Sequence, residues 1–155
     1  MKDKLIKETD LPLALSKISR PLVFTNGVFD ILHRGHVTYL DAARRLGETL
    51  VVALNSDSSV RTLGKGPERP INSEEDRAIV LMALQSVDYV VIFEESNPCS
   101  LIRKMKPEIY VKGGDYDMEE LEETKVVKAW GGHSLALPFL KGFSTTSTLG
   151  KMSKV

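Results

Sequence analysis

The tetrapeptide His33-Arg34-Gly35-His36 is the part of this sequence best suited to chemistry. Its two imidazoles are three residues apart, so they share one face of a helix's first turn. A helix start also offers unpaired backbone N–H groups and the positive end of the helix dipole, which together attract phosphate. An imidazole there can donate a hydrogen bond to an oxygen that gains charge during phosphoryl-type transfer, and Gly35 lets a ligand approach the backbone. The pattern predicts a site for nucleotidyl transfer.

Two other interpretations of the histidine pair remain open at this point. The histidines could be surface or helix-capping residues, because such pairs near glycine also arise by chance. A zinc site is less favoured, since it needs a third protein ligand and only His133, Cys99 or scattered carboxylates are available. We therefore expect no metal ligand among the protein side chains.

Composition narrows the class of protein. A chain of 155 residues is long enough for one domain with one core, over residues 1–155. The 21 Lys and Arg residues balance 21 Asp and Glu residues, so no net field favours nucleic acid or an anionic membrane as a partner. Cys99 is the only cysteine, which excludes an internal disulfide. No apolar run approaches roughly 18 residues and the start is polar, so we expect a cytoplasmic protein.

Short apolar runs alternate with amphipathic segments along nearly the whole chain. This order predicts an α/β domain with a Rossmann-like, doubly wound sheet of five parallel strands. The expected strands cover residues 22–26, 49–55, 89–93, 109–111 and 134–137. Two of the main expected helices cover residues 35–46 and 118–130. Three others are expected to start at Ser73, at Asn97 and near Ser144. Residues 1–20 are expected to form an N-terminal helical segment, and residues 21–150 the catalytic core.

Ligands of doubly wound sheets bind at the carboxyl ends of the strands, near the point where the strand order reverses. This rule predicts that four distant segments share one edge of the sheet, namely residues 26–36, 55–57, 112–116 and 142–147. Lys112 follows a strand beside two glycines, so its ammonium could bind phosphate or be an ordinary exposed lysine. Asp115 could bind a sugar hydroxyl or form an Asx-turn. Ser144, Thr145 and Thr146 could hold phosphate, cap a helix, or do both.

The segment between the second strand and the next long helix adds more candidates. Lys65 and Arg69 lie in a loop rich in glycine and proline, which either closes over a triphosphate or is solvated. Arg77 could pair with phosphate or with a carboxylate. Asp57 could cap a helix or contact a ligand, and Asp30 could orient a histidine or accept hydrogen bonds in a turn.

Two common nucleotide signatures are absent from the sequence. No Gly-x-x-x-x-Gly-Lys-Ser/Thr loop occurs, and Gly64-Lys65-Gly66 lacks the third glycine of a dinucleotide fingerprint. A nucleotide must therefore bind in another way.

Three segments, residues 25–36, 112–116 and 144–146, together resemble the cytidylyltransferase-like superfamily of nucleotidyltransferases. The resemblance covers about residues 20–150. Lys112-Gly113-Gly114-Asp115-Tyr116 and Ser144-Thr145-Thr146, with residues 55–57 and 69–72, are most similar to the adenylyltransferases that make ADP-heptose. Glycerol-3-phosphate cytidylyltransferases share much of this layout. However, they carry an arginine shortly before the Ser-Thr-Thr motif, where this chain offers only Lys141 as a substitute.

The resemblance implies that ATP, accompanied by Mg²⁺, reacts with D-glycero-β-D-manno-heptose 1-phosphate to give ADP-heptose and pyrophosphate. That product serves the lipopolysaccharide core or other surface glycans, and a homo-oligomer is expected. The implied catalytic residues are His33, His36 and Lys112. Nucleotide and phosphate groups are expected at Asn26, Gly27, Val28, Phe29, Gly35, Lys65, Arg69, Arg77, Ser144, Thr145 and Thr146. The sugar phosphate is expected at Asp30, Asn55, Asp57, Gly113, Gly114 and Asp115.

Two alternatives to this function stay open at the level of sequence. A related enzyme would join CTP to glycerol 3-phosphate or another small phosphorylated alcohol. A protein of another class would keep the fold as a nucleotide-sensing module without turnover, because fold alone does not establish activity. The complete set of histidines, lysine and Ser-Thr-Thr argues against the sensor, since a sensor needs no donors around a developing charge.

Overall fold

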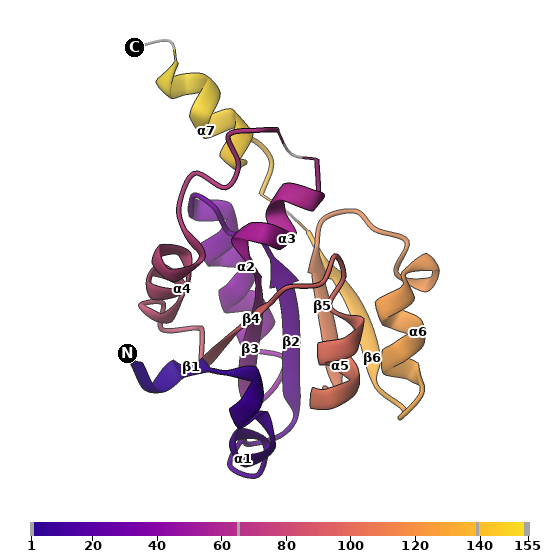
Figure 1. Cartoon of the computed structure of the whole chain (residues 1–155). Coiled ribbons are helices and arrows are strands. Elements are labelled where there is room, and N and C mark those ends of the chain that lie inside the picture. The colour runs from indigo at the N-terminus through magenta and orange to yellow at the C-terminus, as the bar shows by residue number, and fades with distance from the viewer. Residues whose placement is uncertain (1, 65, 139, 154–155) are drawn as a thin grey trace.

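A parallel β-sheet with the strand order β1-β4-β3-β2-β5-β6 forms the centre of the protein (Figure 1). The computed structural model describes residues 2–64, 66–138 and 140–153. Within them every strand pairing is parallel. The strands are β1 (Leu5–Ile6), β2 (Leu22–Gly27), β3 (Thr49–Asn55), β4 (Tyr89–Phe93), β5 (Ile109–Gly113) and β6 (His133–Leu137).

Helices cover both faces of the sheet, as the doubly wound prediction requires. The α-helices are α1 (Leu11–Leu15), α2 (Arg34–Arg44), α3 (Asp57–Thr62), α4 (Glu74–Met82), α5 (Cys99–Met105), α6 (Glu122–Lys128) and α7 (Thr145–Met152). Short 3₁₀ turns are η1 (Lys2–Lys4), η2 (Glu8–Asp10) and η3 (Met118–Glu120). None of these described helices is long and apolar enough to cross a membrane.

The sheet separates two hydrophobic cores, where one was expected from the chain length, because successive side chains of a strand point to opposite faces. Phe24 and Tyr110 pack with residues of α1, α5 and α6 on one face. Leu50 packs with residues of α2 and α4 on the other face. β3 lies near the middle of the sheet and is buried along its whole length, which explains its continuous apolar sequence.

The prediction of five strands was wrong by one strand. Residues 1–20 are not purely helical, because Leu5 and Ile6 form β1 and pair with Val90 and Val91 of β4. A strand of two residues has too few positions to show a period of two, so its sequence carries no strand signal. The helix expected over residues 118–130 is also divided, since Leu121 has extended backbone angles between η3 and α6.

The order of the strands fixes where ligands can gather. From β2 the chain first adds β3 and β4 on one side and later β5 and β6 on the other. The switch point therefore lies between β2 and β5, whose carboxyl ends are Gly27 and Gly113. α7 lies beyond this same end of the sheet and projects from the body of the molecule (Figure 1).

Candidate active site

A pocket of about 420 Å³ opens at the switch point between β2 and β5. It is lined by Asn26, Gly27, Val28, Phe29, His36, Tyr39, Asn55, Leu63, Ser96, Pro98, Lys112, Gly113, Tyr116 and Glu123. A larger cavity, of about 590 Å³, lies beside β1, and its lining includes Glu8, Glu74, Glu94 and Glu95. Four carboxylates repel an anionic ligand, so the switch-point pocket is the better candidate for phosphate.

The two imidazoles of the histidine motif are stacked at the start of α2. Their ring centroids are 3.9 Å apart and their planes differ by 20°. His33 is the N-cap residue with extended backbone, and its carbonyl accepts hydrogen bonds from His36 N and Val37 N. The ring of Phe29 packs against His36 at 5.2 Å. His36 lines the pocket, whereas His33 lies behind it in the stack.

The environment of His33 favours its neutral form. Burial lowers the pKa of His33 from the usual value of 6.5. Its Nδ1 atom is buried and has no hydrogen-bond partner among the described residues. A neutral imidazole keeps one N–H donor, so His33 can still donate to a phosphate oxygen without a positive charge.

Gly35 and Gly27 provide the space that this packing needs. A Cβ atom on Gly35 would lie 3.0 Å from His33 Cε1 and Nδ1 and 3.3 Å from Phe143 Cβ. A Cβ atom on Gly27 would lie 2.9 Å from Phe29 Cε2. Phe29 itself has φ of 47°, a strained conformation for a residue with a side chain. The glycines thus let the aromatic rings approach the backbone closely.

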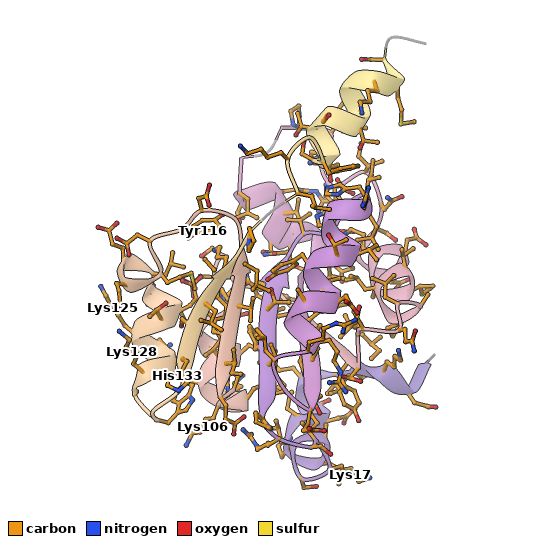
Figure 2. The ribbon with its side chains drawn as sticks, turned by 180° about the vertical axis from the view of Figure 1, so that it is seen from behind. Lys17, Lys106, Tyr116, Lys125, Lys128 and His133 are labelled. Atoms are coloured by element: carbon orange, nitrogen blue, oxygen red, sulfur yellow. The ribbon has the colours of Figure 1, made fainter. Side chains whose placement is uncertain are left out.

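Lys112 reaches the pocket from the carboxyl end of β5. Its ammonium lies 4.8 Å from the ring centroid of Tyr116. Figure 2 shows Tyr116 beyond the sheet, on the connection that follows β5. Gly113 also lines the pocket, but Gly114 does not, and its N–H donates to the Leu137 carbonyl of β6. Asp115 is exposed and does not line the pocket either.

Asp30 and Arg69 hold the loop before α4 against the turn after β2. Asp30 is buried, and its carboxylate accepts hydrogen bonds from Ile71 N and Asn72 N at 2.9 to 3.0 Å. Arg69 forms an ion pair with it at 3.3 Å. Neither residue lines the pocket in the structure, where both are engaged with each other and with the loop, and their predicted phosphate and sugar contacts stay predictions. Lys65, the other cation predicted for this loop, lies outside the described residues.

Of the two roles expected for Arg77, phosphate binding or pairing with a carboxylate, the structure shows the second. The residue is 2% exposed, and its guanidinium donates to the carbonyls of Val28 at 2.6 Å and Asn72 at 3.0 Å. It also pairs with the Asp57 carboxylate at 2.8 Å. These contacts use the guanidinium within the protein, so Arg77 supports the pocket wall from behind. Asp57 is used in the same way and is absent from the pocket lining.

The start of α7 lies beside the histidine turn. Ser144 caps α7 by accepting a hydrogen bond from Ser147 N, and Thr145 Oγ1 donates to the Ile31 carbonyl at 3.3 Å. The Phe143 ring lies 6.4 Å from His33. The structure therefore brings the start of α7 to the histidine turn through Phe143 and Thr145, although Ser144, Thr145 and Thr146 do not line the pocket itself. The helix they start has no buried residue.

Several lining residues carry no motif that the sequence analysis singled out. Ser96 and Pro98 follow β4, so the rule of carboxyl ends would have found them had it been applied to every strand. Tyr39 is buried, which raises its pKa, and its hydroxyl donates to the Val111 carbonyl and bonds with Thr25. This contact fixes α2 against β2 and β5. Glu123 carried no sequence signal for ligand binding, because it lies inside the helix expected over residues 118–130 and not at the end of a strand.

The described part of the chain offers no third ligand for the zinc interpretation of the histidine pair. His133 begins β6 and pairs with the first residue of β5, so it lies toward the amino end of the sheet (Figure 2). Among the described residues no group of three or more His, Cys, Asp or Glu side chains is placed to hold a metal ion.

A doubly wound parallel sheet with imidazoles and a lysine at its switch point defines a nucleotide-binding α/β protein. The family described as Cytidylyltransferase-like matches residues 24–147, and the chain belongs to this family. D-beta-D-heptose 1-phosphate adenylyltransferase of Bordetella bronchiseptica is 56% identical over 151 residues, which are 96% of this chain and 93% of that protein.

Two further relatives widen the comparison. Bifunctional protein HldE of Cronobacter sakazakii is 52% identical over 142 residues, which are 92% of this chain and 30% of HldE. The chain thus corresponds to under a third of that bifunctional relative. The crystal structure of the lipopolysaccharide core biosynthesis protein from Thermoplasma volcanium matches with a TM-score of 0.65 at 32% identity. The match covers 79% of this chain and 98% of that one.

Proposed function

We propose that the protein transfers AMP from ATP to D-glycero-β-D-manno-heptose 1-phosphate, forming ADP-heptose and pyrophosphate. The observation that carries the proposal is the switch-point pocket, where His36 and Lys112 face the same space from opposite sides of the switch. Membership of the nucleotidyltransferase family and the 56% identical heptose 1-phosphate adenylyltransferase support this choice of reaction and substrate.

The chemistry is an in-line displacement at the α-phosphorus of ATP. An oxygen of the sugar 1-phosphate forms the new P–O bond, and the bond to the β-phosphate oxygen breaks with its electron pair leaving on pyrophosphate. No covalent enzyme intermediate is needed, because positioning and charge stabilisation supply the catalysis. His33 and His36 donate hydrogen bonds to phosphate oxygens as negative charge grows on those oxygens in the transition state. Lys112 offsets the charge between the two substrates, and residues 144–146 hold the outer phosphates at the start of α7.

Mg²⁺ is proposed to accompany ATP. The pocket lining holds one carboxylate, so the donor set suits an ion carried by the triphosphate oxygens rather than one held by a cage of side chains. The ion would neutralise charge on the phosphates while the protein groups orient them.

We propose a cytoplasmic location, because the reaction consumes ATP. The heptose product would serve lipopolysaccharide core or other surface glycans. The homo-oligomer stays a prediction, which light scattering of the purified protein tests.

The decisive experiment measures pyrophosphate release with ATP and CTP, each combined with heptose 1-phosphate, glycerol 3-phosphate and phosphocholine. Release with ATP and heptose 1-phosphate alone is the expected result. Release with CTP and glycerol 3-phosphate would support the cytidylyltransferase alternative instead. Tight nucleotide binding without release in any combination would support the sensor.

A further inference from the structure

Glu123 is the acidic residue in the wall of the switch-point pocket. It lies in the first turn of α6, is 8% exposed, and is the one Asp or Glu among the described residues that line the pocket. His36 and Lys112 in the same lining suit phosphate, but a carboxylate repels phosphate. Glu123 therefore has to face a part of a substrate that carries no negative charge.

The Glu123 carboxylate has no internal partner that explains its burial. No hydrogen bond or ion pair joins it to another described residue. Burial, and secondly the negative charge of Glu123, raise the pKa of Tyr110. The Tyr110 hydroxyl donates to Asn26 Oδ1 at 2.9 Å, so the carboxylate lies near this pair beside the pocket. Neither carboxylate oxygen is among the fully buried side-chain atoms that lack a partner, so the oxygens reach the pocket surface, and a ligand that displaces water from them must supply hydrogen bonds in return.

The neighbouring Glu122 shows that helix stability alone does not account for this position. Both acids lie in the first turn of α6 and both benefit from the positive end of its dipole. Glu122 is exposed, whereas Glu123 is turned into the protein and lines the pocket. The outer side of the same helix carries Lys125 and Lys128, which point away from the sheet in Figure 2. The pair of acids thus offers a matched comparison.

The other polar groups in this part of the lining indicate what Glu123 faces. Asn26, Asn55 and Ser96 come from the ends of β2 and β3 and from the loop after β4. Like Glu123, they are hydrogen-bonding groups without a positive charge, although Asn26 and Asn55 each also bond within the protein. Uncharged donors and acceptors in the same pocket as one carboxylate suit a group with several hydroxyls. Both proposed substrates contain such a group, since ATP has a ribose and the acceptor has a heptose ring.

We propose that Glu123 is a specificity-determining residue that accepts hydrogen bonds from the hydroxyls of a substrate sugar. This inference rests on the proposed function. A carboxylate that accepts hydrogen bonds from vicinal hydroxyls rejects analogues without them, because its own desolvation is then uncompensated. The two possible sources, the heptose ring and the ribose of ATP, share this chemistry and are separated by experiment.

The test compares Glu123→Gln with Glu122→Gln in the full chain. Kinetics are measured separately for heptose 1-phosphate and for ATP, together with the melting temperature. Hydrogen bonds to a charged group predict that E123Q raises KM for one substrate roughly ten- to hundredfold. A rise for heptose 1-phosphate alone assigns the heptose, and a rise for ATP alone assigns the ribose. E122Q is expected to leave both KM values and kcat unchanged.

Other outcomes overturn the inference. If a folded E123Q protein keeps both KM values within twofold of the wild type, Glu123 does not bind a substrate sugar. Failure of both E123Q and E123D to fold would make the carboxylate a structural group. If the wild-type protein releases no pyrophosphate from heptose 1-phosphate, the proposed function fails by itself. The ATP dissociation constant of E123Q, from titration calorimetry, then decides the inference: a rise assigns the ribose, and an unchanged value overturns it.

Discussion

At the scale of single residues, the stacked histidines combine two different environments. His36 lines the pocket and packs against Phe29, while His33 stacks behind it and has a lowered pKa through burial. A second positive ring 3.9 Å away would repel a charged His33, so the stack adds to burial in favouring the neutral form of His33. A neutral donor at His33 fits a site that must bind and release a highly charged substrate.

The role of His36 predicts a large loss of turnover on truncation. His36→Ala is expected to lower kcat by about two to three orders of magnitude, as loss of a preorganised donor does. The melting temperature should change little, because the side chain is only partly buried. Steady-state pyrophosphate release measures the effect. His133→Ala is the control, since His133 is exposed and distant from the pocket. A near-normal rate in H36A would exclude the proposed role.

The lowered pKa of His33 predicts how stability depends on pH. The unfolded chain binds the proton with a pKa near 6.5, more readily than the folded protein. The contribution of His33 to stability is therefore complete above that pH and is lost as the pH falls from it through the lower pKa of the folded state. Urea unfolding of the wild type and His33→Gln between about pH 5 and pH 8 measures this. The variant should lose less stability on acidification, and an equal loss in both proteins would contradict the assignment.

At the scale of elements, the segment from Asp30 to Arg77 is held by buried charge. Arg77 joins the turn after β2, the loop before α4 and the start of α3 through Val28, Asn72 and Asp57. Asp30 binds the same loop from the other side. Val28 and Phe29 line the pocket, so this network sets the shape of one wall from behind, although Arg77, Asp57 and Asp30 do not line the pocket themselves.

Truncation of Arg77 should therefore destabilise the whole fold. Arg77→Ala leaves a buried carbonyl and the Asp57 carboxylate without their partner, which costs about 3–5 kcal/mol in comparable cases. The matched control is Arg45→Ala, whose ion pair with Asp41 is exposed and worth about 0–1 kcal/mol. Urea denaturation of both variants gives the free energies of unfolding. If both variants lose the same free energy of unfolding, the buried contacts of Arg77 contribute no more to stability than the exposed ion pair of Arg45.

Helix α7 should matter for activity more than for stability. It has no buried residue, and its start is tied to the histidine turn by the contact of Thr145 with Ile31. Removal of residues 144–155 is expected to change the melting temperature by only a few degrees and to lower turnover by about two orders of magnitude or more. Calorimetry and pyrophosphate release measure the two effects. A truncated protein with full activity would contradict the placement of outer phosphates at Ser144 and Thr146.

At the scale of the whole molecule, the sequence predicted the architecture well and the supporting contacts poorly. Alternating apolar runs predicted the parallel doubly wound sheet, and the rule of carboxyl ends placed His36, Lys112 and Asn55 in one pocket. β1 was missed because two residues show no period. The choice between the two roles of Arg77 was not readable, because sequence does not say whether a cation meets a ligand or a carboxylate and carbonyls of its own chain. Glu123 was missed because its burial depends on how α6 packs.

The separation of the two cores by the sheet has a consequence for evolution. His36 stands on α2, which packs in one core, and Glu123 stands on α6, which packs in the other. Because α2 and α6 pack in different cores, substitutions behind the His36 wall and behind the Glu123 wall are buried among different neighbours. The two walls of the pocket can therefore change along separate mutational routes.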